Sequence, residues 1–334
     1  MIRWLLLSCL VVVGLVLGYF YSDYQRFLDH PSENPETVVF EVKQGNSLGI
    51  VSSRLHKAGL INNVRWFKLM ASREKAETSI KAGEYSIDTG TKPLGILATL
   101  VTGRVRQYSI TFVEGSTFKQ LRQTLSQNSR VRQTLTGLTN QAIMEKLGHS
   151  DQHPEGRFFP ETYFFVNNTS DLGILQRAYQ KMQQTVAEEW AKRDKQLPLE
   201  TADQALTLAS IVEKETGQAS ERETIAGVFV RRLRKSMLLQ TDPTVIYGMG
   251  DSYKGNIRRK DLRTDTPYNT YTRPGLPPTP IAMPGRAAIY AALHPAPGDA
   301  LFFVANGDGS HVFSATLKQH NQAVNQYQKK IKAK

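Results

Sequence analysis

The first hydrophobic feature of the chain is an uncharged run close to its N-terminus. After Arg3, the residues WLLLSCLVVVGLVLGYFYS extend from Trp4 to Ser22, and the next charge is Asp23. A helix of about 19 residues rises roughly 30 Å, which matches the hydrocarbon thickness of a bilayer. The pattern therefore predicts a single transmembrane helix that anchors the chain.

Two cleaved signals are the alternatives to an anchor. A secretory signal has an apolar region of about 7–15 residues and a small-residue cleavage site, and no A-x-A pattern follows here. A lipoprotein signal ending at Cys9 would leave only five residues between Arg3 and that cysteine. We therefore expect an uncleaved anchor. Because Arg3 precedes the run and mixed charges follow it, we expect a cytoplasmic N-terminus.

The hydrophobic period changes twice between residues 38 and 88. VVFEVKQG alternates like a strand, and Ser47 then caps a stretch whose apolar residues recur at helical spacing. Asn63 opens a second helical stretch, VRWFKLMAS, and SIKAGEYSI returns to strand character. This part of the chain is predicted to be a small strand–helix–helix–strand unit, joined to the anchor by the polar linker Asp29–Thr37.

The rest of the chain mixes helices and strands, so we predict an α+β fold. Helices are expected at 91–102, 114–127, 171–193, 206–217 and from 316, and strands at 105–112, 300–305 and 311–313. From Gln240 onward the chain is predicted to be rich in loops. The predicted domains are an anchor with its linker (1–36), the small α+β unit (37–90), a connecting α/β region (91–150) and a larger mixed α+β domain (151–334).

Charge and cysteine content narrow the classes of function. The formal net charge is +12, but we find no zinc-finger spacing, RNP motif or basic-region helix, so nucleic acid is not expected as a partner. For an anchored domain outside the membrane, anionic lipid or an anionic wall polymer fits the charge better. Cys9 is the single cysteine and lies inside the apolar run, which excludes a disulfide or a cysteine nucleophile in the remainder.

Two glutamates interrupt an apolar helix in LTLASIVEKETGQ, residues 206–218. At 100° per residue, Glu213 and Glu215 are separated by about 200°, so they point to different sides and cannot act as a facing pair. Either both lie on solvated edges of an ordinary helix, or one is kept protonated by an apolar environment. Periodicity does not choose between these readings.

Polar and aromatic side chains in the later segments suit a saccharide ligand. Gln240, Asp242 and Asn269 can bond ring hydroxyls, and Tyr271 can pack on the apolar face of a pyranose ring. Glu155 lies in the aromatic segment HPEGRFFPETYFF and could border the same groove. Each of these residues is also compatible with a purely structural role in a turn or loop.

Six segments together resemble a known family. ASIVEKET, LQTDPTVIYG, YNTY, GLPP, EGRFFPETY and GSHVFSATLKQHN are similar to motifs of the YceG-like endolytic murein transglycosylases, the MltG type, and the match covers nearly the whole chain. The family's GLPPG is here GLPPT, with Thr279 in the place of glycine, so we assign Thr279 no role.

The resemblance implies a fold and an activity. It implies that residues 37–90 are a LysM-like subdomain, that residues 151–334 are the catalytic domain, and that Glu213 is the catalytic acid. The reaction would cleave the MurNAc–GlcNAc β-1,4 bond of nascent peptidoglycan, form a 1,6-anhydro-MurNAc end and so terminate glycan elongation. It also implies a single-pass protein of the inner (cytoplasmic) membrane with most of the chain in the periplasm, working beside peptidoglycan synthases, without cofactor or metal.

Two rival functions remain. A non-catalytic, membrane-anchored peptidoglycan-binding protein would explain the anchor and the LysM-like part. A metal-dependent hydrolase would need clustered ligands, but His294, His311 and His320 show no H-x-x-x-H or H-E-x-x-H spacing, and His311 and His320 are expected to be fold residues.

Overall fold

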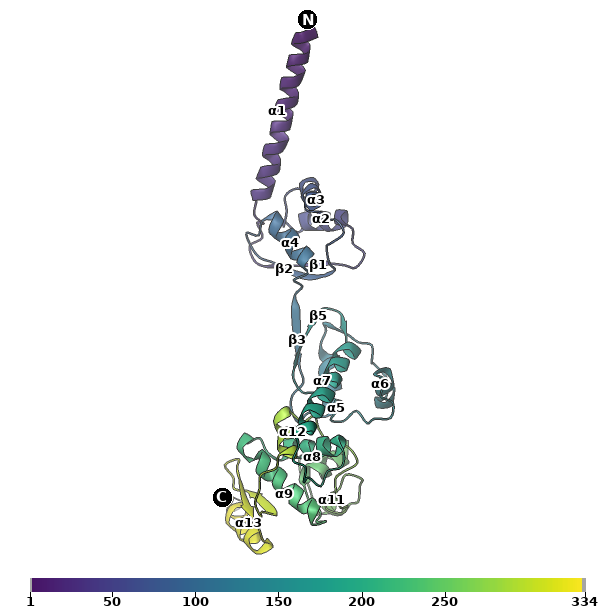
Figure 1. Ribbon diagram of the computed structural model, residues 1–334, viewed down its shortest axis with the longest axis vertical. Helices are drawn as coiled ribbons and strands as arrows, with labels where there is room; N and C mark the ends of the chain where they lie inside the picture. The colour runs from purple at the N-terminus through teal and green to yellow at the C-terminus, as the bar shows by residue number, and fades with distance from the viewer. Residues whose placement is uncertain (1, 332–334) are drawn as a thin grey trace. The chain divides into compact units, whose positions relative to one another are not determined.

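The computed structural model describes residues 2–331 of an α+β protein, which divides into two compact units (Figure 1). Unit 1 comprises residues 1–108 and 164–168, and unit 2 comprises residues 109–163 and 169–334. Met1 of the predicted anchor and residues 332–334 of the predicted catalytic domain lie outside the described residues. The α+β class predicted from the sequence is confirmed.

Unit 1 has the predicted strand–helix–helix–strand order. Its elements are α1 (Ile2–Asp29), β1 (Val38–Val42), α2 (Leu48–Lys57), α3 (Val64–Arg73), β2 (Gly83–Ile87) and α4 (Pro93–Thr102). Strands β1 and β2 pair antiparallel, with Val38 opposite Ile87. The predicted caps are present, because Ser47 accepts a hydrogen bond from the Ile50 amide and Asn63 accepts from the amides of α3.

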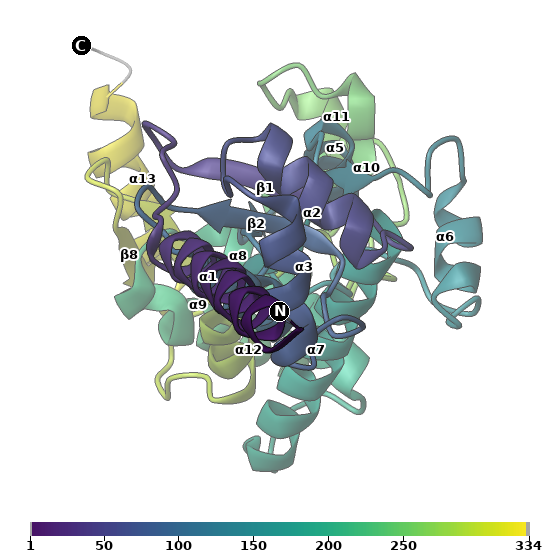
Figure 2. The same ribbon diagram turned by 90° about the horizontal axis from the view of Figure 1, so that it is seen from above.

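The helices of unit 1 bury their apolar sides in one core. Helix α2 packs on α3 (Figure 2), and α4 contacts both α3 and β2. The largest fully buried side chains include Tyr85, Phe67, Leu55 and Leu100, one from each of these four elements. This core explains why a unit with only two strands is stable, since a lone hairpin would not be.

Helix α1 is apolar and mostly exposed. Leu6–Asp29 is long and apolar enough to cross a membrane, and within the described residues it is the one helix that satisfies this test. The helix is longer than the predicted span, since it continues without a break from Ile2 to Asp29. The predicted anchor and the start of the predicted linker therefore form one helix.

Unit 2 is largely helical. Its helices are α5 (Phe118–Gln127), α6 (Asn140–Lys146), α7 (Asp171–Lys192), α8 (Ala202–Glu215), α9 (Arg222–Arg234), α10 (Asp242–Met249), α11 (Arg259–Arg263), α12 (Arg286–Leu293) and α13 (Leu317–Ile331), with short 3-10 turns η1 (Ala219–Glu221) and η2 (Gly250–Ser252). Its strands are β4 (Val131–Arg132), parallel to β6 (Thr169–Ser170), and β7 (Phe302–Ala305), antiparallel to β8 (His311–Ser314). Strands β3 (Gln107–Thr111) and β5 (Thr162–Val166) pair, and the chain passes between the units within both.

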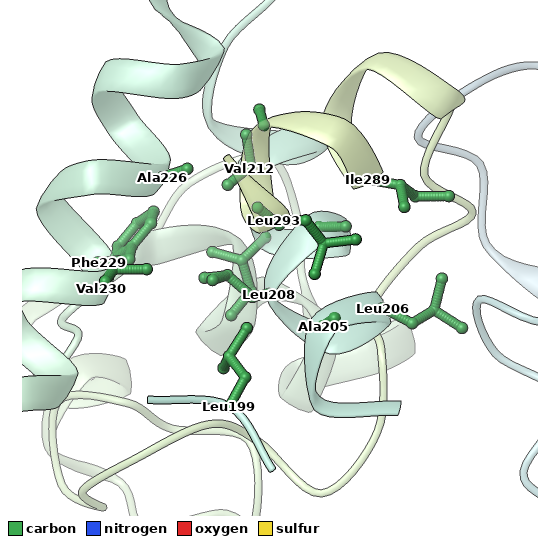
Figure 3. Close-up of a cluster of buried hydrophobic side chains, with 14 of the residues drawn as sticks. Leu199, Ala205, Leu206, Leu208, Val212, Ala226, Phe229, Val230, Ile289 and Leu293 are labelled. Carbon is green, nitrogen blue, oxygen red and sulfur yellow. The ribbon is translucent and has the colours of Figure 1, made fainter. Parts of the chain in front are cut away.

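Helix α8 lies at the centre of the core of unit 2. It contacts α7, α9 and α12, and every residue from Ala205 to Val212 is buried. Figure 3 shows Leu208 of α8 beside Leu293 of α12, with Phe229 and its neighbours on α9 across from them. Because this core fixes α8 from all sides, the helix can hold the residues at its C-terminal end in defined positions.

One predicted loop is a helix. The chain from Gln240 onward was expected to be rich in loops, but α10 starts at Asp242 and runs to Met249. The backbone N–H groups of the first helical turn have no partner within the helix, so a proline there removes no hydrogen bond, and its fixed φ angle is helical. Pro243 therefore favours the first turn of α10. The remainder of the segment, up to α12, is mostly loop, as predicted.

Candidate active site

The C-terminal end of α8 carries the two glutamates out of the core in different directions. Thr201 caps the start of α8 by accepting a hydrogen bond from the Gln204 amide, and the helix ends at Glu215. As the 200° separation predicts, Glu213 and Glu215 have different neighbours. Their surroundings therefore indicate which carboxyl could reach a ligand.

Glu213 is held between three elements. Its side chain is 7% exposed, its Oε2 accepts a hydrogen bond of 3.0 Å from the Gly285 amide before α12, and Arg222 Nη2 lies 3.8 Å from its Oε1. A Cβ atom at Gly285 would clash with the Glu114 carboxylate, so that second acid lies close by. Burial and the nearby Glu114 raise the pKa of Glu213, against the Gly285 hydrogen bond and Arg222, which lower it.

Glu215 lines a cavity instead. The Thr241 hydroxyl donates a hydrogen bond to its Oε1. Burial raises the pKa of Glu215 from 4.5 to about 7; Asp242 adds to the rise, and Thr241, His311 and Arg232 oppose it. Near neutral pH a large fraction of this carboxyl is therefore protonated, which is the form that a general acid needs.

The cavity beside Glu215 has a volume of about 470 Å³ and is built from segments far apart in sequence. Besides Glu215, its lining includes Gln240, Asp242 and Tyr271, with His311 from β8. Three of the residues predicted to bind saccharide are therefore brought together, and they surround Glu215. Among the described residues 2–331, Glu213 does not belong to the lining of this cavity.

The polar groups of the cavity are mutually oriented. The Tyr271 hydroxyl donates a 2.6 Å hydrogen bond to Asp242 Oδ1, and burial with this neighbouring carboxylate raises the pKa of Tyr271. Gln240 has a φ of 51°, and its backbone N–H donates a 3.1 Å hydrogen bond to the Thr270 carbonyl. A left-handed conformation is uncommon for a residue other than glycine, and such residues gather at functional sites.

Arg232 of α9 supports the floor of the same cavity. Its side chain is buried and donates hydrogen bonds to the carbonyls of Leu301, Leu238 and Leu239. The guanidinium also lies 5.1 Å from the centre of the Phe302 ring. A buried cation fixed in this way holds the segment before Gln240 against the β7–β8 hairpin, and it favours negative charge on Glu215.

Two further predicted residues lie outside the cavity lining. Asn269 is 1% exposed; its amide nitrogen donates to the carbonyls of Asp261, Leu262 and Thr264, and its oxygen accepts from the Tyr271 amide. Asn269 thus organises the loop that presents Tyr271, rather than pointing into the cavity.

Glu155 is likewise engaged inside the fold. It is 4% exposed, and its two oxygens accept hydrogen bonds from the Phe118 amide at 2.9 Å and the Tyr247 hydroxyl at 3.1 Å. Burial raises the pKa of Glu155 to about 7. With both oxygens used, this carboxyl ties the start of α5 to α10.

The sequence interpretation missed the pairing of His311 with Glu221. Glu221 accepts hydrogen bonds from the His311 amide at 2.8 Å and lies 2.7 Å from ring Nδ1. A carboxylate at Nδ1 favours a proton there and leaves Nε2 for other partners. His311 was expected to be a fold residue; its place in the motif GSHVF was the available signal. Among the described residues, no group of three or more His, Cys, Asp or Glu could hold a metal ion.

Comparisons with known proteins agree on one family. A family model described as the YceG-like family matches residues 40–326. The chain is 31% identical over 331 residues to an endolytic murein transglycosylase of Bacillus subtilis (strain 168), covering 94% of this chain and 91% of that protein. It is 27% identical over 356 residues to an endolytic murein transglycosylase of Streptococcus pneumoniae serotype 2 (strain D39 / NCTC 7466), covering 95% of this chain and 64% of that one.

A solved structure is also similar. The crystal structure at 2.6 Å of a yceG-like protein from Listeria monocytogenes matches with a TM-score of 0.57 and 30% identity, over 86% of this chain and 99% of that chain. The similarity therefore extends over both units described above.

Proposed function

Because this chain belongs to the YceG-like family, we propose that it is an endolytic lytic transglycosylase acting on the glycan strands of peptidoglycan. It would cleave the β-1,4 bond between N-acetylmuramic acid and N-acetylglucosamine and leave a 1,6-anhydro-muramic acid end. The names of the curated relatives support the substrate and the endolytic mode. The observation in this chain that carries the proposal is a glutamate with a pKa raised to about 7 in a polar cavity of about 470 Å³.

A single carboxyl suffices for this reaction, whereas hydrolytic glycosidases use two. The protonated acid gives its proton to the glycosidic oxygen, and the bond from that oxygen to C1 of muramic acid breaks. The resulting carboxylate then takes the proton of the C6 hydroxyl, whose oxygen closes on C1. The carboxyl thus ends the cycle protonated, as it began, and water takes no part.

Two glutamates compete for the role of the acid. The family resemblance points to Glu213, and its buried position with a raised pKa is compatible with that role. The geometry favours Glu215, because Glu215 lines the cavity with Gln240, Asp242 and Tyr271. We therefore place the acid on Glu215 and keep Glu213 as the alternative.

The neighbours of Glu215 can take supporting roles. Asp242 lies near enough to Glu215 to raise its pKa, and a carboxylate there would stabilise positive charge that develops at C1. Tyr271, bonded to Asp242, and Gln240 would contact the sugar rings. Asn269 and Glu155 would act indirectly, by holding the loop and helices around the cavity.

If Glu215 is the acid, Glu213 positions it. The hydrogen bond from Gly285 and the ion pair with Arg222 tie the last turn of α8 to the start of α12 and of α9. Loss of these contacts would let the last turn of α8 move, and displacement of a reacting group by about 1 Å can cost about 100-fold in rate.

The proposal extends to unit 1 and to the cellular setting. Helix α1 would cross the inner membrane once with its N-terminus in the cytoplasm, and residues 37–90 would form a LysM-like subdomain that binds glycan. Most of the chain would then be periplasmic, where cleavage of nascent strands beside peptidoglycan synthases would terminate their elongation. The apolar length of α1 supports the anchor, and the β1–α2–α3–β2 order supports the subdomain.

The test is mass spectrometry of purified peptidoglycan treated with the full chain in detergent. Wild-type protein, Glu213→Gln, Glu215→Gln and the exposed control Glu223→Gln are compared. We expect 1,6-anhydro-muramic acid ends from the wild type and the control, none from Glu215→Gln, and a reduced yield from Glu213→Gln.

Each other outcome has a clear meaning. If Glu213→Gln produced no 1,6-anhydro ends while Glu215→Gln remained active, Glu213 would be the acid. Reducing ends from the wild type would indicate a hydrolase that uses a second carboxylate, with Asp242 the first candidate. Binding without cleavage by any variant would favour the non-catalytic peptidoglycan-binding protein.

A further inference from the structure

Helix α1 enters the core of unit 1 without a flexible joint. Its uncharged run ends at Ser22, and Tyr24 and Phe27 of the same helix are already 7% and 2% exposed within that core. The helix is continuous to Asp29. At 1.5 Å per residue, Phe27 lies only about 8 Å beyond Ser22 along the helix axis. If α1 crosses a bilayer, unit 1 is therefore held close to its surface.

Helix α3 lies at the level where the uncharged run ends. Trp66 of α3 donates a 2.7 Å hydrogen bond from Nε1 to Asp23 Oδ2. Its ring lies 6.2 Å from the ring of Phe20 and 5.3 Å from that of Tyr24. Phe20 belongs to the uncharged run, so Trp66 is placed at the boundary between hydrocarbon and headgroups, where tryptophan and tyrosine are enriched.

The charged side chains of α3 are all basic and exposed, and the helix carries no acid to oppose them. Arg65, Lys68 and Arg73 are exposed, and the sequence VRWFKLMASR contains no aspartate or glutamate. The Arg73 guanidinium lies 5.2 Å from the Tyr24 ring, which keeps it beside α1. Arg26 of α1 is exposed in the turn that follows Ser22.

The acids nearest in sequence do not neutralise this group. Asp23 accepts a hydrogen bond from the neutral indole of Trp66 and keeps its charge, so it offsets one of these four cations, while Asp29 pairs with Lys92 at 2.9 Å. Glu74 follows α3 but is accompanied by Lys75. The two helices therefore present a net positive surface at the level of the headgroups.

We propose that α3, together with Arg26, forms a membrane-surface contact that binds the headgroups of anionic phospholipids. The contact requires α1 to span the bilayer, but it is independent of the proposed chemistry in unit 2. Basic side chains beside a membrane span are attracted to anionic lipid within a Debye length of the surface. Unit 1 would then be held on the bilayer surface by headgroup contacts in addition to the covalent connection to α1.

The test measures how close α3 lies to lipid. In a full chain with Cys9→Ser, a fluorophore is attached at Leu69→Cys on α3 or at Val39→Cys on β1, both exposed positions. Figure 1 shows β1 farther than α3 from the part of α1 that carries the uncharged run. The chain is reconstituted in phosphatidylcholine vesicles with or without phosphatidylglycerol, and quenching by spin-labelled headgroups is recorded.

We expect the label at position 69 to be quenched several-fold more than the label at 39, and the excess to grow with phosphatidylglycerol and shrink with salt. Arg65→Gln with Lys68→Gln should remove most of the increase in this excess that phosphatidylglycerol causes, because each basic residue near an anionic surface contributes a factor of about five. The matched pair Lys43→Gln with Lys57→Gln, exposed elsewhere in unit 1, should leave it unchanged.

Several results would overturn the proposal. Equal quenching at positions 39 and 69 would mean that α3 does not face the bilayer. Quenching that is independent of phosphatidylglycerol, or that responds equally to both pairs of substitutions, would mean that α3 does not bind anionic headgroups. A chain released from vesicles by alkaline washing would remove the premise that α1 spans the membrane. None of these results bears on whether unit 2 cleaves peptidoglycan.

Discussion

Replacing Glu215 by glutamine should stabilise the protein in a pH-dependent way while removing activity. Its pKa is raised from 4.5 to about 7 in the folded chain, which corresponds to about 3 kcal/mol of less favourable ionisation. Below about pH 4.5 the carboxyl is protonated in both the folded and the unfolded chain, so its folding carries no ionisation penalty. As the pH rises to about 7 the unfolded chain ionises first, so wild-type stability falls and then levels off. Glutamine cannot ionise, and its amide oxygen can still accept the Thr241 hydrogen bond.

The assay is thermal unfolding of wild type and Glu215→Gln at pH 4 and pH 8. We expect equal midpoints at pH 4 and a variant that unfolds about 6–12 °C higher at pH 8, since 1 kcal/mol shifts the midpoint of a domain of this size by about 2–4 °C. Glu223→Gln, at an exposed position, serves as the control. A difference of the same size at both pH values would refute the reasoning, because the gain would then come from packing rather than from ionisation.

Three further predictions concern the neighbours of Glu215. Tyr271→Phe removes the 2.6 Å hydrogen bond to Asp242 and should lower kcat/KM about 5- to 30-fold, from about 1–2 kcal/mol, with little change in stability; an unchanged kcat/KM would remove Tyr271 from the site. Asn269→Ala leaves three loop carbonyls without their donor and should lower the free energy of unfolding by about 2–4 kcal/mol. An unfolding free energy equal to that of the wild type in a denaturant titration would contradict the role of Asn269 in the loop. His311 Nε2, on the side of the ring away from Glu221, is expected to bind saccharide, so His311→Gln should raise KM more than it lowers kcat. Glu221→Gln is the control, because it keeps a hydrogen-bond partner for the ring but removes the charge. If Glu221→Gln changes KM and kcat as much as His311→Gln does, the effect comes from charge and not from a contact with saccharide.

Local patterns in the sequence predicted the elements that depend on local rules. The unit from β1 to β2 was predicted in its order because its periods change clearly and Ser47 and Asn63 act as caps. The prediction of a loop directly after Gln240 was wrong, because Asp242-Pro243 suits both a turn and the first turn of a helix. Only the packing of α10 on α8 distinguishes the two.

The site was harder to predict because it is assembled from distant segments. The 200° separation correctly implied that Glu213 and Glu215 face different surroundings, but it could not say which side holds a cavity. That side depends on Gln240, Tyr271 and His311, which are brought to Glu215 by the tertiary fold. Asn269 shows the converse difficulty, because its amide suits a saccharide as well as it suits the three carbonyls that it binds.

The left-handed backbone at Gln240 has a consequence for which substitutions position 240 can accept. The φ of 51° favours glycine and, among residues with a side chain, asparagine and aspartate, whereas β-branched residues are strained there. Binding of a saccharide in the cavity instead requires a side-chain amide at position 240 that can reach the ligand. Asparagine meets both demands, so in a library of all amino acids at this position it should be retained when selection is for activity. Glycine should be retained when selection is for folding alone, and valine and isoleucine should be lost under both.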